Sequence, residues 1–107
     1  IAASIDKPWL DFKHNTQGTL SVLEWMRQLD IPILVNASSS AVYGESSERW
    51  KEYMAKYPIN HYGASKLAAE AHISGFCHVY GLRAYRYRFA NVVGRRATRG
   101  VIWDLYG

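Results

Sequence analysis

The chain has 107 residues and a formal net charge of +4, and 49% of its residues are hydrophobic while 21% are charged. This composition excludes a disordered, collagen-like or mucin-like chain, and the length suits one small globular domain. No apolar run reaches the roughly 18 residues of a membrane helix, the first residues do not form a signal peptide, and a single cysteine suits a reducing compartment, so we expect a cytoplasmic protein with no membrane partner.

The first half of the chain predicts a strand end, a long helix and a buried strand. Residues 1–5 are small and apolar, which is typical of the end of a strand. From Pro8 to about Leu29, apolar residues recur at three- and four-residue steps, which predicts one long amphipathic helix. A short apolar run over residues 31–37 then indicates a strand buried on both faces of a parallel sheet, with Pro32 at its start, where a missing N–H is tolerated.

The second half predicts a loop, a second long helix and another strand. Residues 44–56 are polar and charged, which indicates a surface loop with a short helix. Residues 62–80 have apolar positions at helical spacing, and Gly81 predicts a C-terminal cap. Residues 83–89 alternate with period two, so the arginines and the aromatic side chains should lie on opposite faces of a strand. Long helices between short strands indicate right-handed parallel crossovers, and therefore an α/β layered sheet.

Two features suggest where this sheet would bind a ligand. Ligands of open parallel sheets bind at the carboxyl ends of the strands, here residues 38–44 and 91–99. Tyr62 and Lys66 stand one helical turn apart at the start of the second helix, so both face this edge. The Lys66 ammonium would favour the Tyr62 phenolate and lower its pKa from about 10, and the pair could then exchange a proton with a substrate hydroxyl. By itself, this spacing is also typical of an exposed helix face.

The positive charge is concentrated in the last quarter of the chain. Six arginines and one acid, Asp104, stand at or after Arg83, which gives this segment +5, whereas seven basic and eight acidic residues before it give −1. This distribution predicts a local site for an anionic ligand and not a generally basic protein. Nucleic-acid binding is the competing interpretation of the segment. It is disfavoured because the strand alternation separates arginines from aromatic side chains, so we expect no nucleic-acid partner.

Four short motifs occur in order on the predicted elements: NTQGTL (15–20), SSSAVYG (38–44), YGASKLAAE (62–70) and RFANVVG (88–94). Together they resemble the NAD-dependent epimerase/dehydratase family, the extended short-chain dehydrogenases/reductases that act on nucleotide sugars. The resemblance covers residues 2–105, and residues 88–104 are most similar to UDP-glucose 4-epimerase-type members. It implies an enzyme with NAD as cofactor and a nucleotide sugar, such as a UDP-sugar, as substrate. It also implies a homodimer formed through the two long helices.

The resemblance assigns a role to individual residues. Tyr62 would be the catalytic acid/base, Lys66 would hold the nicotinamide ribose and lower the pKa of Tyr62, and Ser39 would be the catalytic serine that bonds the reacting sugar hydroxyl. The other residues that it places against the cofactor are Ala2, Ala3, Asn15, Ala37 and Ser38. The other residues that it places against the substrate and its diphosphate are Ser40, Arg88, Asn91 and Arg95. It implies no metal.

The implied reaction is a transient oxidation. Tyr62 would take the proton of the sugar 4-hydroxyl while NAD takes hydride from C4, and the keto sugar would turn over and receive the hydride on its other face. In dehydratases of the family, Asp and Glu follow the catalytic serine or threonine, whereas Ser40 and Ala41 stand here. Epimerisation is therefore favoured, with another nucleotide-sugar reductase or dehydratase of the family as the alternative.

The glycines of the chain form neither a G-x-x-G-x-x-G nor a G-x-G-x-x-G motif, which the resemblance places in the first strands of the fold. We therefore expect residues 1–107 to be an internal fragment of a longer enzyme, inactive by itself. Its fold would be the later strands and helices of a doubly wound, Rossmann-like NAD(P)-binding domain, without the first strands and without the substrate domain. A non-catalytic scaffold or dimerisation fragment is the alternative of a different class.

Overall fold

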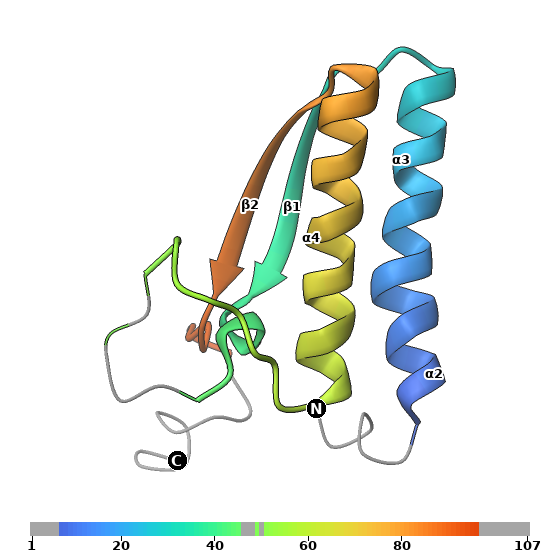
Figure 1. Cartoon of the computed structure of the whole chain (residues 1–107). Coiled ribbons are helices and arrows are strands. Elements are labelled where there is room, and N and C mark those ends of the chain that lie inside the picture. The colour runs from blue at the N-terminus through green and yellow to red at the C-terminus, as the bar shows by residue number, and fades with distance from the viewer. Residues whose placement is uncertain (1–6, 46–48, 50, 97–107) are drawn as a thin grey trace.

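The computed structural model describes residues 7–45, 49 and 51–96. They form a two-stranded parallel sheet with two helical rods beside it (Figure 1). The first rod contains helix α2 (Pro8–Asp11), the π-helical turn η1 (Phe12–Gln17) and helix α3 (Gly18–Gln28). It is followed by strand β1 (Ile33–Ser39), the 3-10 helix η2 (Ser40–Tyr43), helix α4 (His61–Tyr80) and strand β2 (Arg83–Phe89).

The order helix, strand, helix, strand confirms the predicted α/β class, and β1 pairs with β2 in parallel. The first rod has the predicted extent, although the π-helical turn within it was not predicted. β2 has the predicted bounds, whereas β1 lies two residues later than the predicted 31–37: it begins at Ile33, after Pro32, and ends at Ser39. The predictions for residues 1–5 and for a helix beginning near residue 101 lie outside the described residues.

The ends of α4 are fixed by residues suited to them. At its start, the Asn60 side chain accepts a hydrogen bond from the Gly63 N–H at 2.8 Å. At its end, Gly81 adopts the left-handed conformation, with φ 73°, and its N–H donates to the Cys77 carbonyl at 3.0 Å. The predicted C-terminal cap is therefore confirmed. Since α4 runs opposite to both strands, its first turn lies beside their carboxyl ends (Figure 1).

Helix α4 lies between α3 and the sheet, and the core forms on both of its sides. The core includes Leu23 and Met26 of α3, Ile73 of α4 and Val42 of η2, all of which are buried. Small side chains such as Ala69 let neighbouring elements approach α4 closely. No helix among the described residues combines the length and apolarity needed to cross a membrane.

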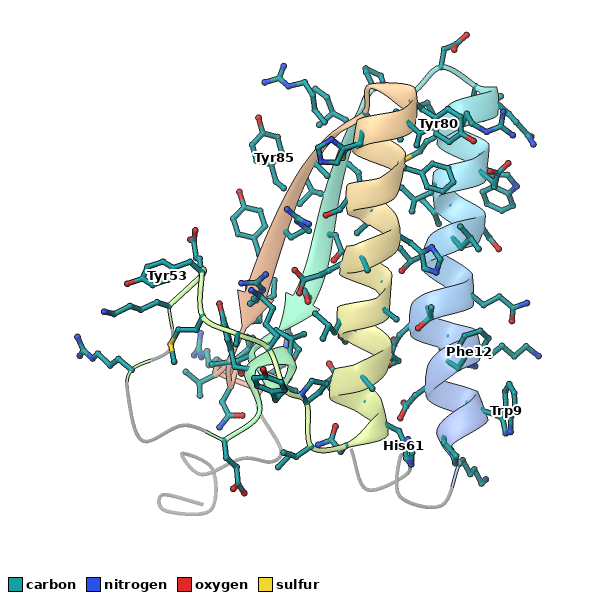
Figure 2. The ribbon with its side chains drawn as sticks, in the orientation of Figure 1. Trp9, Phe12, Tyr53, His61, Tyr80 and Tyr85 are labelled. Carbon is teal, nitrogen blue, oxygen red and sulfur yellow. The ribbon has the colours of Figure 1, made fainter. Side chains whose placement is uncertain are left out.

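The prediction that the first strand is buried on both faces is wrong for this structure. Even-numbered residues of the two strands face α4, whereas Val35, on the other face, keeps 66% of its surface exposed. Tyr85, Tyr87 and Phe89 share this open face and are also exposed, and Figure 2 shows Tyr85 pointing away from the helices. The reason is that, within the described residues, helices cover one face of the sheet.

The predicted short helix within residues 44–56 is also absent from the described part of that segment. The helical turn lies earlier instead, at Ser40–Tyr43, and Gly44 terminates it. Gly44 has φ 71° and ψ −147°, a backbone conformation that residues other than glycine rarely adopt. A Cβ at this position would also overlap the carbonyl oxygen of Tyr57. Gly44 thus permits the close passage of the loop past the end of η2.

We expect Gly44→Ala to destabilise the protein more than Gly81→Ala. Both glycines have a positive φ, but Gly44, with ψ −147°, lies outside the left-handed region that Gly81 occupies with ψ 20°. In addition, a Cβ at Gly81 meets no atom within 4 Å, whereas one at Gly44 meets the Tyr57 backbone. Gly81→Ala should therefore cost about 1 to 2 kcal/mol for the left-handed conformation alone, and Gly44→Ala should exceed it. Urea denaturation of both variants measures the difference. Equal losses would contradict the extra cost expected at Gly44 from its backbone conformation and from the Tyr57 contact.

Candidate functional site

A pocket of about 420 Å³ lies at the carboxyl ends of the strands and beside the first turn of α4. Four residues singled out by the sequence line it together: Ser39, Ser40, Tyr62 and Asn91. They come from β1, η2, α4 and the segment after β2. The structure therefore brings together side chains that are far apart in the sequence, at the edge where a parallel sheet binds its ligand.

A close backbone contact holds Tyr62 near Ser39. A Cβ at Gly63 would lie 2.6 Å from the Ala41 carbonyl oxygen, so only glycine allows α4 to start this close to η2. On the other side of the pocket, the Ser39 Oγ accepts a hydrogen bond from the Ala41 N–H at 3.1 Å. This bond orients the Ser39 hydroxyl as the N-cap of η2, and it does not use the hydroxyl's own hydrogen.

Lys66 connects Tyr62 with the end of β1. Its ammonium donates to the Ala37 carbonyl at 3.0 Å and lies 5.9 Å from the centre of the Tyr62 ring. That bond uses one of the three ammonium hydrogens, so two more can be given to a ligand's hydroxyl groups. A positive charge is thus fixed beside the tyrosine, in the place that the sequence predicted from the four-residue spacing.

Asn15 reaches the same helix from the π-helical turn. The Asn15 side-chain amide donates to Ser65 Oγ at 3.0 Å, and Ser65 Oγ in turn donates to the Tyr62 carbonyl at 2.8 Å. The neighbouring Thr16 hydroxyl, which is buried, donates to the Ser65 carbonyl at 2.9 Å. Two consecutive residues of η1 therefore bind the first turn of α4, and single π-helical turns often occur at such functional positions.

A largely buried ion pair lies between α4 and the sheet, with 4% of the Glu70 side chain and 18% of the Arg88 side chain exposed. Arg88 also lines a second pocket, together with Ser40 and Tyr43. Arg88 Nη2 donates to Glu70 Oε1 at 2.8 Å, and Arg88 Nε donates to Oε2 at 3.2 Å. The Ser38 hydroxyl also donates to Glu70 Oε2, at 2.8 Å. On its other side, Arg88 Nη1 donates to the Tyr43 hydroxyl at 2.7 Å and to the Glu52 carbonyl at 3.1 Å.

The contacts of this pair keep Glu70 charged although only 3% of its surface is exposed. Burial acts to raise the pKa of Glu70, but hydrogen bonds from Arg88 and Ser38 and the positive charges of Arg88 and Arg86 outweigh burial and lower it. The hydrogen bonds that Arg88 donates to Glu70 likewise raise the pKa of Arg88. Both members of the pair are therefore ionised at neutral pH.

The structure places the remaining predicted site residues elsewhere. Ser38 is buried and directs its hydroxyl to Glu70, and Arg88 is engaged by Glu70 and Tyr43. Arg95 lines a separate pocket with its chain neighbours. Ala2 and Ala3 lie outside the described residues. The cofactor and substrate contacts expected of all these residues stay predictions, and the engagement of Arg88 in a buried pair was not foreseen.

Sequence reasoning missed three side chains that shape the site: Glu70, Tyr43 and Ser65. Each stands in a quoted motif but was given no role. A signal for Glu70 was present in the sequence, because it is the one acidic residue of residues 61–80 and follows Lys66 by one turn. The strand alternation put Arg88 on the face opposite the tyrosines. An acid on the covering helix was its natural partner.

Comparisons with known proteins agree on one family. A family model described as the NAD dependent epimerase/dehydratase family matches residues 1–104. A UDP-glucose 4-epimerase of Streptomyces lividans is 38% identical over 102 residues, which are 94% of this chain and 30% of that protein. A UDP-glucuronate 4-epimerase of Thermodesulfobacterium geofontis is 34% identical over 95 residues, 88% of this chain and 29% of that protein.

Solved structures give the same result. The UDP-glucose 4-epimerase of Thermus thermophilus, solved in complex with NAD, matches with a TM-score of 0.84 and 39% identity, over 92% of this chain and 33% of that one. The enzyme of Thermotoga maritima, solved with UDP-glucose, matches with a TM-score of 0.86 and 30% identity, over 96% and 36% of the two chains. The fold is therefore part of the Rossmann-type fold of these proteins, and the chain spans about a third of their length.

We expect Glu70→Gln to make the stability less dependent on pH in the acid range. Because the folded pKa of Glu70 is lowered, its charged form stabilises the fold above the ordinary glutamate pKa of 4.5, and this contribution is lost as the pH falls through the lower folded value. Urea denaturation at neutral pH and at a series of values below 4.5 should show a steeper loss in the parent protein than in the variant.

Glu24→Gln is the matched control, since Glu24 bonds Arg27 at 2.7 Å on the exposed surface of α3. Exposed pairs contribute little, so this variant should keep nearly the parental pH dependence. Equal slopes for the parent and Glu70→Gln would contradict the lowered pKa.

Proposed function

The chain belongs to the NAD dependent epimerase/dehydratase family, and from this membership we propose that it carries the catalytic segment of a UDP-sugar 4-epimerase that uses bound NAD. The observation that supports this most is the pocket that joins Ser39, Tyr62 and Asn91, with the Lys66 ammonium beside the tyrosine. Because the chain spans about 30% of the length of curated relatives, the activity is proposed for the full-length protein.

Tyr62 is the proposed acid/base. Its side chain lines the pocket, and the Lys66 ammonium stabilises the negative charge of a phenolate. A phenolate can accept the proton of the sugar 4-hydroxyl, and the resulting phenol can return it. Ser39 lines the same pocket, and its hydroxyl hydrogen can donate to the reacting oxygen of the sugar. The proton thus moves between the sugar oxygen and Tyr62 Oη while Ser39 holds that oxygen in place.

The residues around Lys66 fit the nicotinamide end of NAD. The ammonium has hydrogens beyond the one bound to Ala37, and a ribose diol is a suitable acceptor for them. Ala37 and Asn15 complete the proposed cofactor contacts, together with Ser38, which follows Ala37 in β1. When bound, NAD accepts hydride from the sugar C4 and returns it, so substrate and product have the same oxidation state. Residues 1–107 contain no glycine-rich phosphate loop, so these contacts concern the nicotinamide half of the cofactor.

Epimerisation is preferred over dehydration because of the residues that follow Ser39. Elimination of water from the sugar requires a group that protonates the leaving hydroxyl. Ser40 lines the pocket with a weakly acidic hydroxyl, and Ala41 offers no proton at all. Oxidation and reduction at one carbon need only an acid/base and a hydride acceptor. Tyr62 is the proposed acid/base, and bound NAD is the proposed hydride acceptor.

We predict that Tyr62→Phe abolishes epimerisation in the full-length protein while NAD stays bound. The phenyl ring keeps the packing but cannot take a proton, so turnover of UDP-glucose to UDP-galactose should fall by about 100- to 10,000-fold. NAD content is read from the absorbance of the denatured protein's released cofactor. Tyr80→Phe is the matched control at the far end of the same helix and should keep parental turnover. Parental turnover in Tyr62→Phe would contradict the assignment of the acid/base.

We further propose that the protein is a homodimer that pairs through its two long helices. Beyond the stripe that packs on α4, the first rod carries a second apolar stripe that includes Trp9, which is 80% exposed, and Trp25, which is 65% exposed. Figure 2 shows Trp9 and Phe12 on the side of the rod away from the sheet. On α4, Val79 is exposed as well. Large exposed apolar side chains on neighbouring elements are typical of an interface between protein surfaces.

Trp25→Glu should convert the proposed dimer to a monomer. In a two-fold symmetric interface the substitution occurs twice, and each charge would have to be buried without a partner. Sedimentation velocity of the full-length protein measures the change. Tyr53→Glu, an exposed aromatic residue outside the helices, is the control and should leave the mass unchanged. A monomeric parent protein would contradict the proposed assembly.

A further inference from the structure

One guanidinium, that of Arg88, connects four parts of the structure. It lies on β2, forms the ion pair with Glu70 of α4, and donates to the Tyr43 hydroxyl at the end of η2. It also donates to the carbonyl of Glu52, in the loop that follows η2. The Arg88 guanidinium carbon lies 5.1 Å from the centre of the Tyr43 ring, so the ring packs against its face as well.

These contacts join the elements that carry the proposed catalytic groups. Glu70 follows Lys66 by one turn of α4, the helix that carries Tyr62 in its first turn. Ser38, which donates to Glu70, precedes Ser39 in β1, and Tyr43 closes the short helix whose N-cap is Ser39. The network therefore reaches Ser38, which precedes Ser39, Tyr43 at the end of the short helix that Ser39 caps, and helix α4. It includes no residue that touches the substrate in the proposed reaction.

A buried ion pair is weak evidence for stability, because removing two charges from water costs about as much as their attraction returns. Its geometry, in contrast, is strict: the paired hydrogen bonds of a guanidinium and a carboxylate fix both distance and orientation. The pair lies where β1, β2 and α4 meet, and small shifts there change the separation of Ser39 and Tyr62. Such shifts matter because a reacting group misplaced by about 1 Å can lose about 100-fold in rate.

Building on the proposed function, we infer that Glu70 and Arg88 are positioning residues, which hold Ser39 and Tyr62 at the separation that proton transfer requires. Arg88 then acts from behind the pocket, through Glu70 and Tyr43, and not through contact with the substrate diphosphate. The two roles exclude each other for one guanidinium. Turning Arg88 outward to a diphosphate would leave the Glu70 carboxylate buried without its cation, which is strongly unfavourable.

A double-mutant cycle in the full-length protein tests this inference. Glu70→Gln, Arg88→Gln and the combined variant should each lower kcat by about 10- to 100-fold, with little change in the KM for UDP-glucose. The combined variant should be no slower than the slower single variant, since either change already breaks the pair. Arg88→Lys, which keeps the charge but not the paired geometry, should recover only part of kcat.

A milder variant keeps the test decisive if the ion-pair variants fold poorly. Tyr43→Phe removes the hydroxyl that accepts from Arg88 at 2.7 Å but keeps the buried ring. It should lower kcat in the same direction, by less, with an unchanged KM. Glu24→Gln breaks the exposed pair with Arg27, so it controls for the loss of a Glu–Arg pair and should keep the parental kcat.

The outcomes separate this inference from the function on which it rests. If Arg88→Gln had a raised KM and the parental kcat, and Glu70→Gln had the parental kcat and KM, Arg88 would contact the substrate. That result would overturn the inference. Parental kcat in Glu70→Gln, in Arg88→Gln and in the combined variant would also overturn the inference. If these variants do not fold, parental kcat in Tyr43→Phe would overturn it instead. In either case, an inactive Tyr62→Phe would leave the proposed function standing. An inactive parent protein loaded with NAD would overturn both.

Discussion

The parallel pairing of β1 with β2 is the constraint on which the other features depend. Two parallel strands cannot be joined by a tight turn, so the chain must return along the sheet, and here α4 makes that return. Its first turn consequently lies at the carboxyl ends of both strands. This placement brings Tyr62 to the pocket that Ser39 and Asn91 also line. It also explains why the tight backbone contact of α4 with η2, at Gly63, occurs where α4 begins.

Parallel pairing also decides what lies between the sheet and α4. In register, Ser38 of β1 is opposite Arg88 of β2, and both side chains face the helix. The covered face is therefore polar toward the carboxyl ends of the strands, and the open face carries the tyrosines and Val35. A polar covered face is stable only if its groups find partners, and Glu70 supplies one to both Ser38 and Arg88. On the open face, the exposed apolar side chains would gain the most free energy from being buried away from water.

Local patterns were sufficient to predict the two long helical rods and the two strands, but not the short helical turns or all the contacts between elements. Helical spacing, the strand alternation and Gly81 predicted the two long helices, β2 and the α4 cap, because each depends on near neighbours in the chain. The π-helical turn was not predictable, because it depends on Asn15 and Thr16 meeting Ser65, about 50 residues later. The orientation of the Ser38 hydroxyl depends in the same way on the carboxylate of Glu70, which belongs to another element. The motifs located the pocket, whereas the partners behind it required the packed structure.

The buried pair also affects the charge that Tyr62 experiences. Arg88 and Lys66 are two cations on neighbouring elements at one end of the sheet, and Glu70 pairs with the arginine. Within the described residues, no carboxylate lies at ion-pair distance from Lys66, whose ammonium is held by a neutral carbonyl instead. A carboxylate partner would cancel much of the lysine's field, whereas a carbonyl fixes its position and leaves its charge. The arrangement thus neutralises the Arg88 cation and keeps the charge of Lys66 beside the tyrosine that we propose as the acid/base.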